Sequence, residues 1–290
     1  MRVARTRSDM QGVREAATDA GQTLALVPTM GYLHEGHLRL VDLARKQADE
    51  TVLSIYVNPT QFGAGEDLES YPRDLERDLG LAESRGVDVA FVPSDREMYP
   101  QPQSVWVDPG DELGGRLCGA SRPAHFRGVL TVVAKLFGIV QPDVAVFGRK
   151  DYQQAVLIRR MVGELALPVR IELAPIVREP DGLAMSSRNA YLTEAQRSSA
   201  LGLARALRAV REAFAGGERT AQRLAELARD VMEVAGVRVD YAEVVHPDDL
   251  SPVSEAEPAS ICAVAGYVGT TRLIDNAPVA GPSSLENVGA

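Results

Sequence analysis

The sequence predicts an α/β fold in which a Rossmann-like parallel sheet domain is followed by a smaller α+β domain. In the first part of the chain, short apolar runs alternate with segments of helical periodicity, the pattern of βαβ units with right-handed crossovers. In the last part, two long helical segments precede three strand-like segments, which is the order of an α+β domain. A chain of 290 residues can form one large domain or two smaller ones. We place the boundary so that the predicted domains are residues 1–176 and 177–290.

The predicted strands of the first domain are apolar and rich in β-branched residues. They cover residues 23–27, 51–57, 87–92, 143–148 and 169–177, with a short edge strand over 104–107. The helices between them carry apolar residues three and four positions apart. They cover residues 37–48, 74–86, 128–140 and 152–166, and Gly86 ends the second of them. We expect residues 115–128 to form a loop.

In the second domain, Thr193 and Gln196 have the spacing of a capping box, which predicts a helix from there to about residue 215. Gly216 and Gly217 end this helix, and a second helix follows over residues 220–235. The predicted strands cover residues 237–245, 261–269 and 271–276. The tail, residues 281–290, is expected to be mobile.

Composition narrows the class of protein. A net charge of −9 argues against a general nucleic-acid binder, although a few local cations can still hold one small anionic ligand. The two cysteines, Cys118 and Cys262, are far apart, which argues against a disulfide framework and fits a reducing cytosol. No segment approaches the ~20 apolar residues of a membrane span, so we expect a cytoplasmic protein without a membrane partner.

Lysine is rare in this sequence. Of 31 basic residues, only Lys46, Lys135 and Lys150 are lysines. A lysine is therefore an unusual choice in this chain.

The first candidate segment covers residues 28–37 and lies between a predicted strand end and a predicted helix start. Ligands of open parallel sheets bind at the carboxyl ends of strands, and the N–H groups at a helix start suit phosphate. His34 and His37 are half of the histidines in the chain, and their spacing lets both rings point at one ligand. Gly36 would let a phosphate or purine approach the backbone. The segment predicts a nucleotide phosphate site.

Two other interpretations of this segment stay open. A zinc protease helix has two histidines four positions apart in the pattern HExxH, and the sequence HEGH is one residue short of it. The two histidines could also lie at a helix start without any ligand.

The second candidate segment, residues 147–154, again lies between a strand end and a helix start. Lys150 is one of the rare lysines, and a compact ammonium suits a phosphate oxygen as a point charge. The alternative is a solvated lysine at a helix start. Asp151 could cap the helix or accept a ribose hydroxyl, and Gln154 lies about one helical turn further along.

Two weaker segments complete the set. Residues 185–189 offer adjacent hydroxyls and an arginine, a clamp suited to a leaving pyrophosphate, although Ser and Asn also favour ordinary turns. Residues 58–62 include Gln61, whose amide has donors and an acceptor for a substrate with hydroxyl and carboxylate groups. Three of the four segments follow strands of one predicted sheet, so we expect all four to converge on one crevice.

These segments occur together in an order and spacing that resemble a known family. The matching stretches are VPTMGYLHEGH, VNPTQF, the YPR of residues 71–73, the HFRGV of residues 125–129, FGRKDYQQ and MSSRNAYL. The sequence resembles the pantothenate synthetase (pantoate–β-alanine ligase) family over nearly its whole length. HEGH is also similar to the HIGH signature of the wider adenylyl-transferring superfamily, and MSSRN stands where that superfamily has its KMSKS-type loop.

The resemblance implies a nucleotide-binding Rossmann-like domain, a C-terminal domain that acts as a lid, and a homodimer. It implies two chemical steps with MgATP as a substrate. The carboxylate of (R)-pantoate attacks the α-phosphorus of ATP to give pantoyl adenylate, bound without a covalent link, and pyrophosphate. The amine of β-alanine then attacks the acyl carbon to give pantothenate and AMP.

The resemblance also implies which residues contact ATP. They are Pro28, Thr29, Met30, Gly31, Tyr32, Leu33, His34, Glu35, Gly36, His37, Gly148, Arg149, Lys150, Asp151, Val177, Met185, Ser186, Ser187 and Arg188. Within this set, the residues implied in catalysis are His34, His37, Lys150 and Arg188, and His37 matches a histidine described in the family as a proton donor. Arg149 stands where the family more often has Glu or Gln.

Further roles follow from the same resemblance. Asp151 is implied to face the ribose, Val177 the adenine, and Gln61 and Gln154 the pantoate. Gln61 also faces β-alanine. Asp78 is implied to lie near the magnesium ion, which is held mainly by the ATP phosphates.

Three other functions fit part of the pattern. A related adenylyl-transferring enzyme would make a dinucleotide instead of an amide. A nucleotide-sensing module would bind ATP without producing AMP. A zinc hydrolase would lose activity with a zinc chelator in excess magnesium.

Overall fold

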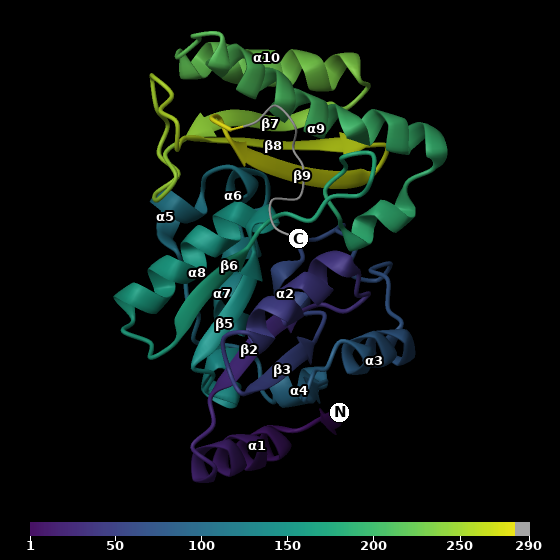
Figure 1. Ribbon diagram of the computed structural model, residues 1–290, viewed down its shortest axis with the longest axis vertical. Helices are drawn as coiled ribbons and strands as arrows, with labels where there is room; N and C mark the ends of the chain where they lie inside the picture. Colours follow the sequence, from purple (N-terminus) through teal and green to yellow (C-terminus); the bar gives the residue numbers. More distant parts are fainter. Residues whose placement is uncertain (282–290) are drawn as a thin grey trace. The chain divides into compact units, whose positions relative to one another are not determined.

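A computed structural model of the protein describes residues 1–281 and divides into two compact units. The first unit consists of Met1–Gly110, Arg122–Arg149 and Leu157–Ala174. The second consists of Asp111–Ser121, Lys150–Val156 and the described residues from Pro175 onward (Figure 1). The predicted domain boundary between residues 176 and 177 stays a prediction, and residues 282–290 of the expected mobile tail lie outside the described residues.

A six-stranded sheet forms the centre of the first unit, with the strand order β1-β4-β3-β2-β5-β6. Its strands are β1 (Arg2–Ala4), β2 (Leu24–Thr29), β3 (Glu50–Ile55), β4 (Val89–Phe91), β5 (Val144–Gly148) and β6 (Arg170–Ala174). All neighbouring strands are parallel, which confirms the predicted Rossmann-like sheet. From β2 the chain runs outward through β3 to β4 and then returns to β5 on the other side of β2. The order therefore reverses between β2 and β5, where ligands of such sheets bind.

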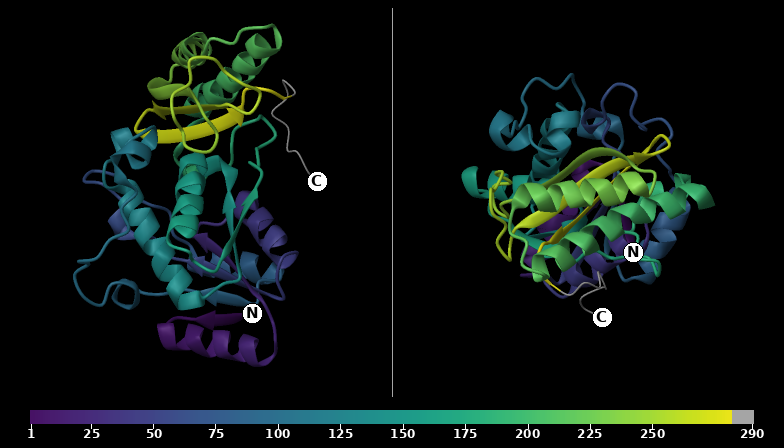
Figure 2. Two further views of the ribbon diagram at one scale, coloured as in Figure 1. Left: turned by 90° about the vertical axis from the view of Figure 1, so that its left-hand side faces the viewer. Right: turned by 90° about the horizontal axis from the view of Figure 1, so that it is seen from above.

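Helices cover both faces of this sheet (Figure 2). They are α1 (Arg7–Asp19), α2 (Glu35–Arg45), α3 (Leu75–Ser84), α4 (Asp95–Met98), α7 (His125–Val140) and the part of α8 (Tyr152–Glu164) from Leu157 onward, with the 3₁₀ turn η1 (Pro59–Gln61). The 3₁₀ turn η2 (Arg149–Asp151) and the start of α8 cross from the first unit to the second. On one face, Val27 of β2 packs in a cluster with Val41 and Ala44 of α2. Leu24 and Leu26 point to the opposite face because strand side chains alternate, and they are also fully buried. The central strand is thus covered on both sides.

The structure corrects two expectations and adds two elements that the sequence analysis did not predict. The first 19 residues form β1 and α1, whose signal is a capping box between Thr6 and Asp9 ahead of a buried face. Residues 104–107 form no strand, because the N–H of Val107 donates to the Thr131 hydroxyl instead of a neighbouring strand, and Val105 is exposed. Residues 115–128 are not a single loop, since they contain a short helix and the first turn of α7.

The second unit contains a three-stranded antiparallel sheet with the order β7-β8-β9. Its elements are α5 (Gly110–Gly114), α6 (Cys118–Ser121), η3 (Ser187–Tyr191), α9 (Glu194–Ala215), α10 (Ala221–Val234), β7 (Arg238–Val245), β8 (Ile261–Val268) and β9 (Thr271–Pro278). The capping box of Thr193 and Gln196 at the start of α9 is confirmed. The predicted α+β fold of this part is also confirmed.

The alternation of β8 explains why residues 111–121 belong to the second unit. Cys262 and Val264 pack in a core cluster with residues of α9 and α10. Ile261 and Ala263, on the other face, pack with Leu117. The segment between α5 and α6 therefore covers the face of the sheet that the long helices leave open.

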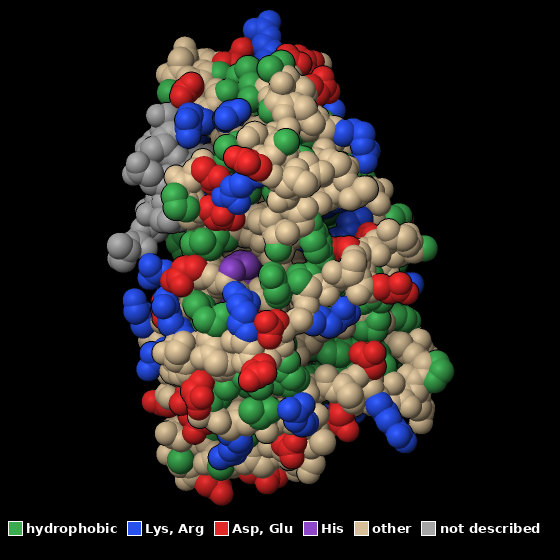
Figure 3. All heavy atoms as spheres, turned by 90° about the vertical axis from the view of Figure 1, so that its right-hand side faces the viewer, with side chains coloured by type: hydrophobic (Ala, Val, Ile, Leu, Met, Phe, Trp, Pro, Cys, Tyr) green, Lys and Arg blue, Asp and Glu red, His purple; other side chains and the backbone are tan. Residues whose placement is uncertain are grey.

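The surface carries both signs of charge. On the face drawn in Figure 3, acidic and basic side chains are interspersed, and a histidine is visible among them. Among the described residues, no helix has the length and apolar character needed to cross a membrane.

Candidate active site

The loop after β2 begins the candidate site. Thr29, at the end of the strand, donates from its hydroxyl to the Ser54 carbonyl at 2.7 Å and accepts from the Gly31 N–H at 3.2 Å. Gly31 and Tyr32 both have positive φ, at 80° and 49°. The left-handed region is easy for glycine but costly for tyrosine, so the surrounding structure must hold this turn in place.

Asp78 of α3 holds the turn. Its carboxylate is buried and accepts from the backbone N–H groups of Tyr32 and Leu33, each at 2.7 Å. Burial raises the pKa of Asp78 above its usual value, although these two hydrogen bonds oppose that shift. A Cβ atom at Gly31 would lie 2.9 Å from a carboxylate oxygen of Asp78, so the close approach requires glycine. The expected place of Asp78 near magnesium stays a prediction.

His34 and His37 come together at the start of α2. Their rings are stacked with centroids 4.0 Å apart. The backbone N–H of His34 donates to Nδ1 of His37 at 3.3 Å. Nδ1 therefore carries no proton in this arrangement, and the neutral His37 ring has its proton on Nε2. His37 is thus prepared to donate a hydrogen bond from Nε2.

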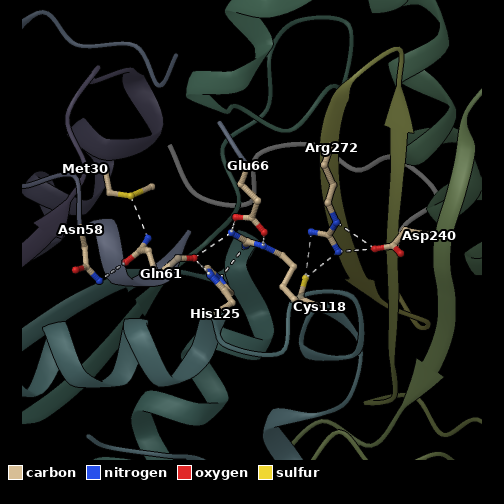
Figure 4. A network of polar contacts seen from close by, with 9 residues as sticks. Met30, Asn58, Gln61, Glu66, Cys118, His125, Asp240 and Arg272 are labelled. Atoms are coloured by element: carbon tan, nitrogen blue, oxygen red, sulfur yellow. Dashed lines mark hydrogen bonds and ion pairs between the residues drawn. The ribbon is translucent and has the colours of Figure 1, made fainter. Parts of the chain in front are cut away.

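The side chain of Gln61 lies against the same loop. Gln61 follows β3 in η1, and its Nε2 donates to Sδ of Met30 at 3.0 Å. Its Oε1 accepts from Nδ2 of Asn58 at 3.1 Å (Figure 4). Asn58 is itself buried and also donates to the Gly128 carbonyl at 3.2 Å. The amide expected to bind pantoate therefore contacts a residue of the loop expected to bind ATP.

The backbone of Gln61 is held by a second group of residues. His125 Nδ1 lies 2.8 Å from the Gln61 carbonyl, and Arg122 donates to the same carbonyl at 3.3 Å. Arg122 also donates to Nε2 of His125 at 3.0 Å. Because a guanidinium can only donate, Nε2 of His125 accepts and its Nδ1–H donates to Gln61.

Arg122 pairs with the carboxylate of Glu66 through two short hydrogen bonds. Burial raises the pKa of Glu66, but the hydrogen bonds and charge of Arg122 outweigh this effect and hold the pKa below its usual value. The pair therefore ties the loop after Gln61 to the start of α7.

The end of β5 carries the second candidate segment. Gly148 and Arg149 belong to the first unit, where β5 lies beside β2 at the reversal of strand order. Lys150 and Asp151 follow in η2, with the ammonium 3.7 Å from a carboxylate oxygen of Asp151. The Lys150 carbonyl accepts from Asn276 of β9 at 2.9 Å, which fixes the backbone of Lys150 in the second unit.

The two adjacent glutamines of α8 differ in role. Gln153 is buried, accepts from the Cys118 N–H at 3.0 Å and donates to the carbonyls of Leu113 and Arg116. Gln154 is only partly buried. The hydrogen bonds of Gln153 show that it holds neighbouring segments together, and the expected contact of Gln154 with pantoate stays a prediction.

The remaining predicted residues lie in the second unit. The N–H of Met185 donates to the Val177 carbonyl at 2.9 Å, so these two residues are neighbours. The Ser186 hydroxyl accepts from the Arg188 N–H at 3.2 Å and begins η3, where Ser187 is buried. Asn189 donates to Glu179 and to the Ala184 carbonyl, which closes this loop on itself.

Each unit thus brings together a part of the expected site. The first unit joins the loop after β2, Gln61 and Asp78, and the second joins Val177 with the 185–188 segment. The convergence of all four segments on one triphosphate stays a prediction. Within residues 1–281, no group of three or more His, Cys, Asp and Glu side chains is arranged to hold a metal ion. Cys118 and Cys262 are both free and buried.

Several residues of the site have no counterpart in the sequence analysis. Asn58, Arg122 and His125 support Gln61 but received no role, although His125 is one of only four histidines. The hydrogen bonds of Asp78 to the loop were also missed. Arg122, His125 and Asp78 lie tens of residues from their partners in the sequence, where no short motif connects them. Asn58 lies only three residues from Gln61 in the NPTQF motif, but the motif alone does not show that its side chain contacts Gln61.

Known proteins that are similar to this chain are pantoate-beta-alanine ligases, also called pantothenate synthetases. The family model described as pantoate-beta-alanine ligase matches residues 2–278. A pantothenate synthetase of Geotalea uraniireducens is 53% identical over 277 residues, which cover 95% of this chain and 98% of that relative. One of Geobacter sulfurreducens is 52% identical over 277 residues, with the same coverage.

Two solved structures described as pantothenate synthetase or pantoate-beta-alanine ligase are also similar to this chain. The crystal structure of pantothenate synthetase from Thermus thermophilus has 44% sequence identity and a TM-score of 0.91, covering 97% of this chain and 100% of that one. Pantoate-beta-alanine ligase from Francisella tularensis, complexed with beta-gamma ATP and β-alanine, has 31% identity and a TM-score of 0.81 over 98% of this chain and 100% of that one. With a family model over almost its whole length and relatives that share about half of its residues, this chain belongs to the pantoate-beta-alanine ligase family.

Proposed function

We propose that this chain condenses (R)-pantoate with β-alanine at the expense of ATP to give pantothenate, AMP and pyrophosphate. The chain is a ligase by family, and a relative from Francisella tularensis has been crystallised with an ATP compound and β-alanine. The observation that carries the proposal is the 3.0 Å contact between Gln61 Nε2 and Met30 Sδ. It joins an amide suited to pantoate to a loop suited to ATP, and the first step requires both substrates side by side.

In the first step, a carboxylate oxygen of pantoate attacks the α-phosphorus of ATP. The bond from the α-phosphorus to the oxygen that bridges to the β-phosphorus breaks, and pyrophosphate leaves with the bonding electrons. The products are pyrophosphate and pantoyl adenylate, which stays bound without a covalent link to the protein. Holding two reactants in the right geometry can supply about 7–11 kcal/mol of the barrier in such a reaction.

The approach of one anion to another requires positive charge and hydrogen-bond donors around the phosphates. His37 would donate from Nε2, the position that carries its proton when Nδ1 accepts from the His34 N–H. His34 would contact the phosphates beside it, and Lys150 and Arg188 would place positive charge there. These four residues are the proposed catalytic residues.

Separate residues would bind pantoate and the ribose and adenine of ATP. Gln61 would bind pantoate through Nε2, because thioether sulfur is a weak acceptor that a pantoate oxygen readily replaces. Gln154 is the second proposed pantoate ligand. Asp151 would face the ribose and Val177 the adenine, while the other residues of segments 28–37, 148–151 and 185–188 line the ATP.

In the second step, the amine of β-alanine attacks the acyl carbon of pantoyl adenylate. A C–N bond forms, the C–O bond to AMP breaks, and the amine nitrogen releases a proton. Water would hydrolyse the same intermediate, so the site must exclude it during the reaction. The C-terminal domain, residues 177–290, which carries Val177 and the 185–188 segment, is the proposed lid.

Magnesium enters this scheme as part of the substrate MgATP. A site for Mg²⁺ usually combines one or two carboxylates with waters and substrate phosphates, so a full protein cage is not required. We further propose a homodimer in the cytoplasm, and light scattering of the purified protein tests the dimer.

An AMP-release assay with ATP, pantoate and β-alanine, each omitted in turn, tests the proposed function. AMP should appear only when all three are present, together with pantothenate. AMP without β-alanine, or no AMP with all three substrates, would overturn it.

Gln154→Ala should raise the KM for pantoate more than the KM for ATP, and an unchanged KM for pantoate would remove Gln154 from the site.

A further inference from the structure

The side chain of Tyr99 contacts the residue that orients Gln61. Tyr99 directly follows α4, and its hydroxyl donates to Oδ1 of Asn58 at 2.8 Å. Thr60 Oγ1 lies 3.0 Å from the same oxygen and 3.2 Å from the Tyr99 hydroxyl, and its single proton can serve only one of them. The Tyr99 hydroxyl therefore supports the amide of Asn58, which is buried.

The orientation of Asn58 decides the orientation of Gln61. The oxygen of Asn58 faces donors, the Tyr99 hydroxyl and the Thr60 N–H, and its nitrogen faces the Gly128 carbonyl. That nitrogen must then meet Oε1 of Gln61, not Nε2, since two N–H groups cannot bond to one another. Gln61 consequently turns its Nε2 toward Met30 and presents a donor to that side.

The ring of Tyr99 is fixed by one of the rare lysines. The ammonium of Lys135 lies 4.7 Å from the ring centroid and donates to Oε1 of Gln103 at 3.0 Å. A cation over an aromatic face is attractive and limits how the ring can move. Lys135, left without a role by the sequence, thus holds the phenol that supports Asn58.

We propose that Tyr99 is a positioning residue for pantoate recognition, acting through Asn58 on the amide of Gln61. This inference rests on the proposed function, in which Gln61 binds pantoate. Without the phenol hydroxyl, Asn58 loses its shortest hydrogen bond and its amide is held less firmly, by Thr60 and the Gly128 carbonyl. Gln61 would then present an oxygen to pantoate in part of the molecules, and an oxygen repels a carboxylate.

Tyr99→Phe is the direct test, because it removes the hydroxyl and keeps the ring under Lys135. Loss of one neutral hydrogen bond corresponds to a change of about 2- to 10-fold in affinity. We expect the KM for pantoate to rise by about that factor while the KM for ATP stays within twofold. The matched control is Tyr56→Phe, because Tyr56 is a buried tyrosine whose hydroxyl donates to Asp95 at 2.9 Å and not to Asn58. It should leave both constants within twofold of the wild type.

A double-mutant cycle separates positioning from a general structural effect. Pantoate affinity is measured by calorimetry, which requires no turnover, in wild type, Tyr99→Phe, Gln61→Ala and the double variant. Tyr99→Phe should weaken binding in the wild-type background and change it by less than twofold in the Gln61→Ala background. An equal effect in both backgrounds, or no effect in either, would overturn the proposal. A wild-type protein that makes no pantothenate would instead overturn the proposed function.

Discussion

Asp78→Asn removes a negative charge and one acceptor from the turn that precedes His34. In the native protein, the two carboxylate oxygens accept from the N–H groups of Tyr32 and Leu33 at 2.7 Å each, inside the protein. Asparagine offers one oxygen, and its NH₂ group must face the other N–H. One backbone donor is then left against another donor in a turn that contains the left-handed Tyr32.

The expected size of the effect follows from these contacts. Burial of the native charge outweighs the effect of its two hydrogen bonds on the pKa of Asp78, so the main cost of the substitution is the buried backbone donor left without an acceptor, about 1–3 kcal/mol. We expect Asp78→Asn to lower the free energy of unfolding by about 2 kcal/mol, or Tm by about 4–8 °C. A misplacement of about 1 Å can cost about 10²-fold in rate, so kcat/KM for ATP should fall about 10- to 100-fold.

The assay is steady-state pyrophosphate release at saturating pantoate, with ATP and magnesium varied independently. Asp74→Asn is the matched control, because Asp74 caps the same helix through the Arg77 N–H at 3.1 Å and does not touch the turn. It should keep kcat/KM for ATP within threefold of the wild type. Values within twofold for Asp78→Asn would refute the reasoning. Rescue of Asp78→Asn by excess magnesium would show that this carboxylate acts on the metal instead of the turn.

Three further predictions concern other parts of the site. Lys150→Ala should lower kcat by about 10²- to 10³-fold in single-turnover adenylate formation, as loss of one stabilising donor does elsewhere, and a loss below tenfold would contradict its role. Gly128→Ala should lower the free energy of unfolding by about 1–3 kcal/mol and weaken pantoate binding, because the added Cβ would lie 2.3 Å from the Thr60 carbonyl oxygen. The control is Gly138→Ala on the same helix, whose Cβ would meet nothing within 4 Å and should not destabilise the protein. The pKa of Glu66 is lowered in the folded protein, so its stabilisation is complete above its usual value of 4.5 and is lost as the pH falls through the folded pKa. Glu66→Gln should therefore flatten the acid side of a plot of Tm against pH, and an unchanged slope would count against the ion pair.

Local signals in the sequence predicted much of the fold. The capping box of Thr193 and Gln196 begins a helix because both partners lie within one turn. The apolar run of residues 51–57 predicted a central strand, and the structure has β3 there, over Glu50–Ile55, because both faces of a parallel sheet are buried. Residues 104–107 were predicted to form a short edge strand, but they have no neighbouring strand to pair with. Periodicity alone does not show where a partner strand lies.

The candidate site was predicted to the extent that its residues lie in short motifs. The stacked histidines lie in HEGH, and Gln61 lies in NPTQF. The supports of those residues come from elsewhere in the chain, as with Asp78 for the turn and His125 for the Gln61 carbonyl. Such pairings depend on how α3 and α7 pack against the sheet, and that packing is a property of the whole unit.

The central claim is that the loop after β2 and Gln61 form one site in which ATP activates pantoate. The most direct test is isotope exchange between ATP and pyrophosphate in the absence of β-alanine. Exchange should require pantoate and should fall at least tenfold in Gln61→Ala at a fixed, subsaturating pantoate concentration. Exchange that proceeds without pantoate, or that requires β-alanine, would contradict the claim.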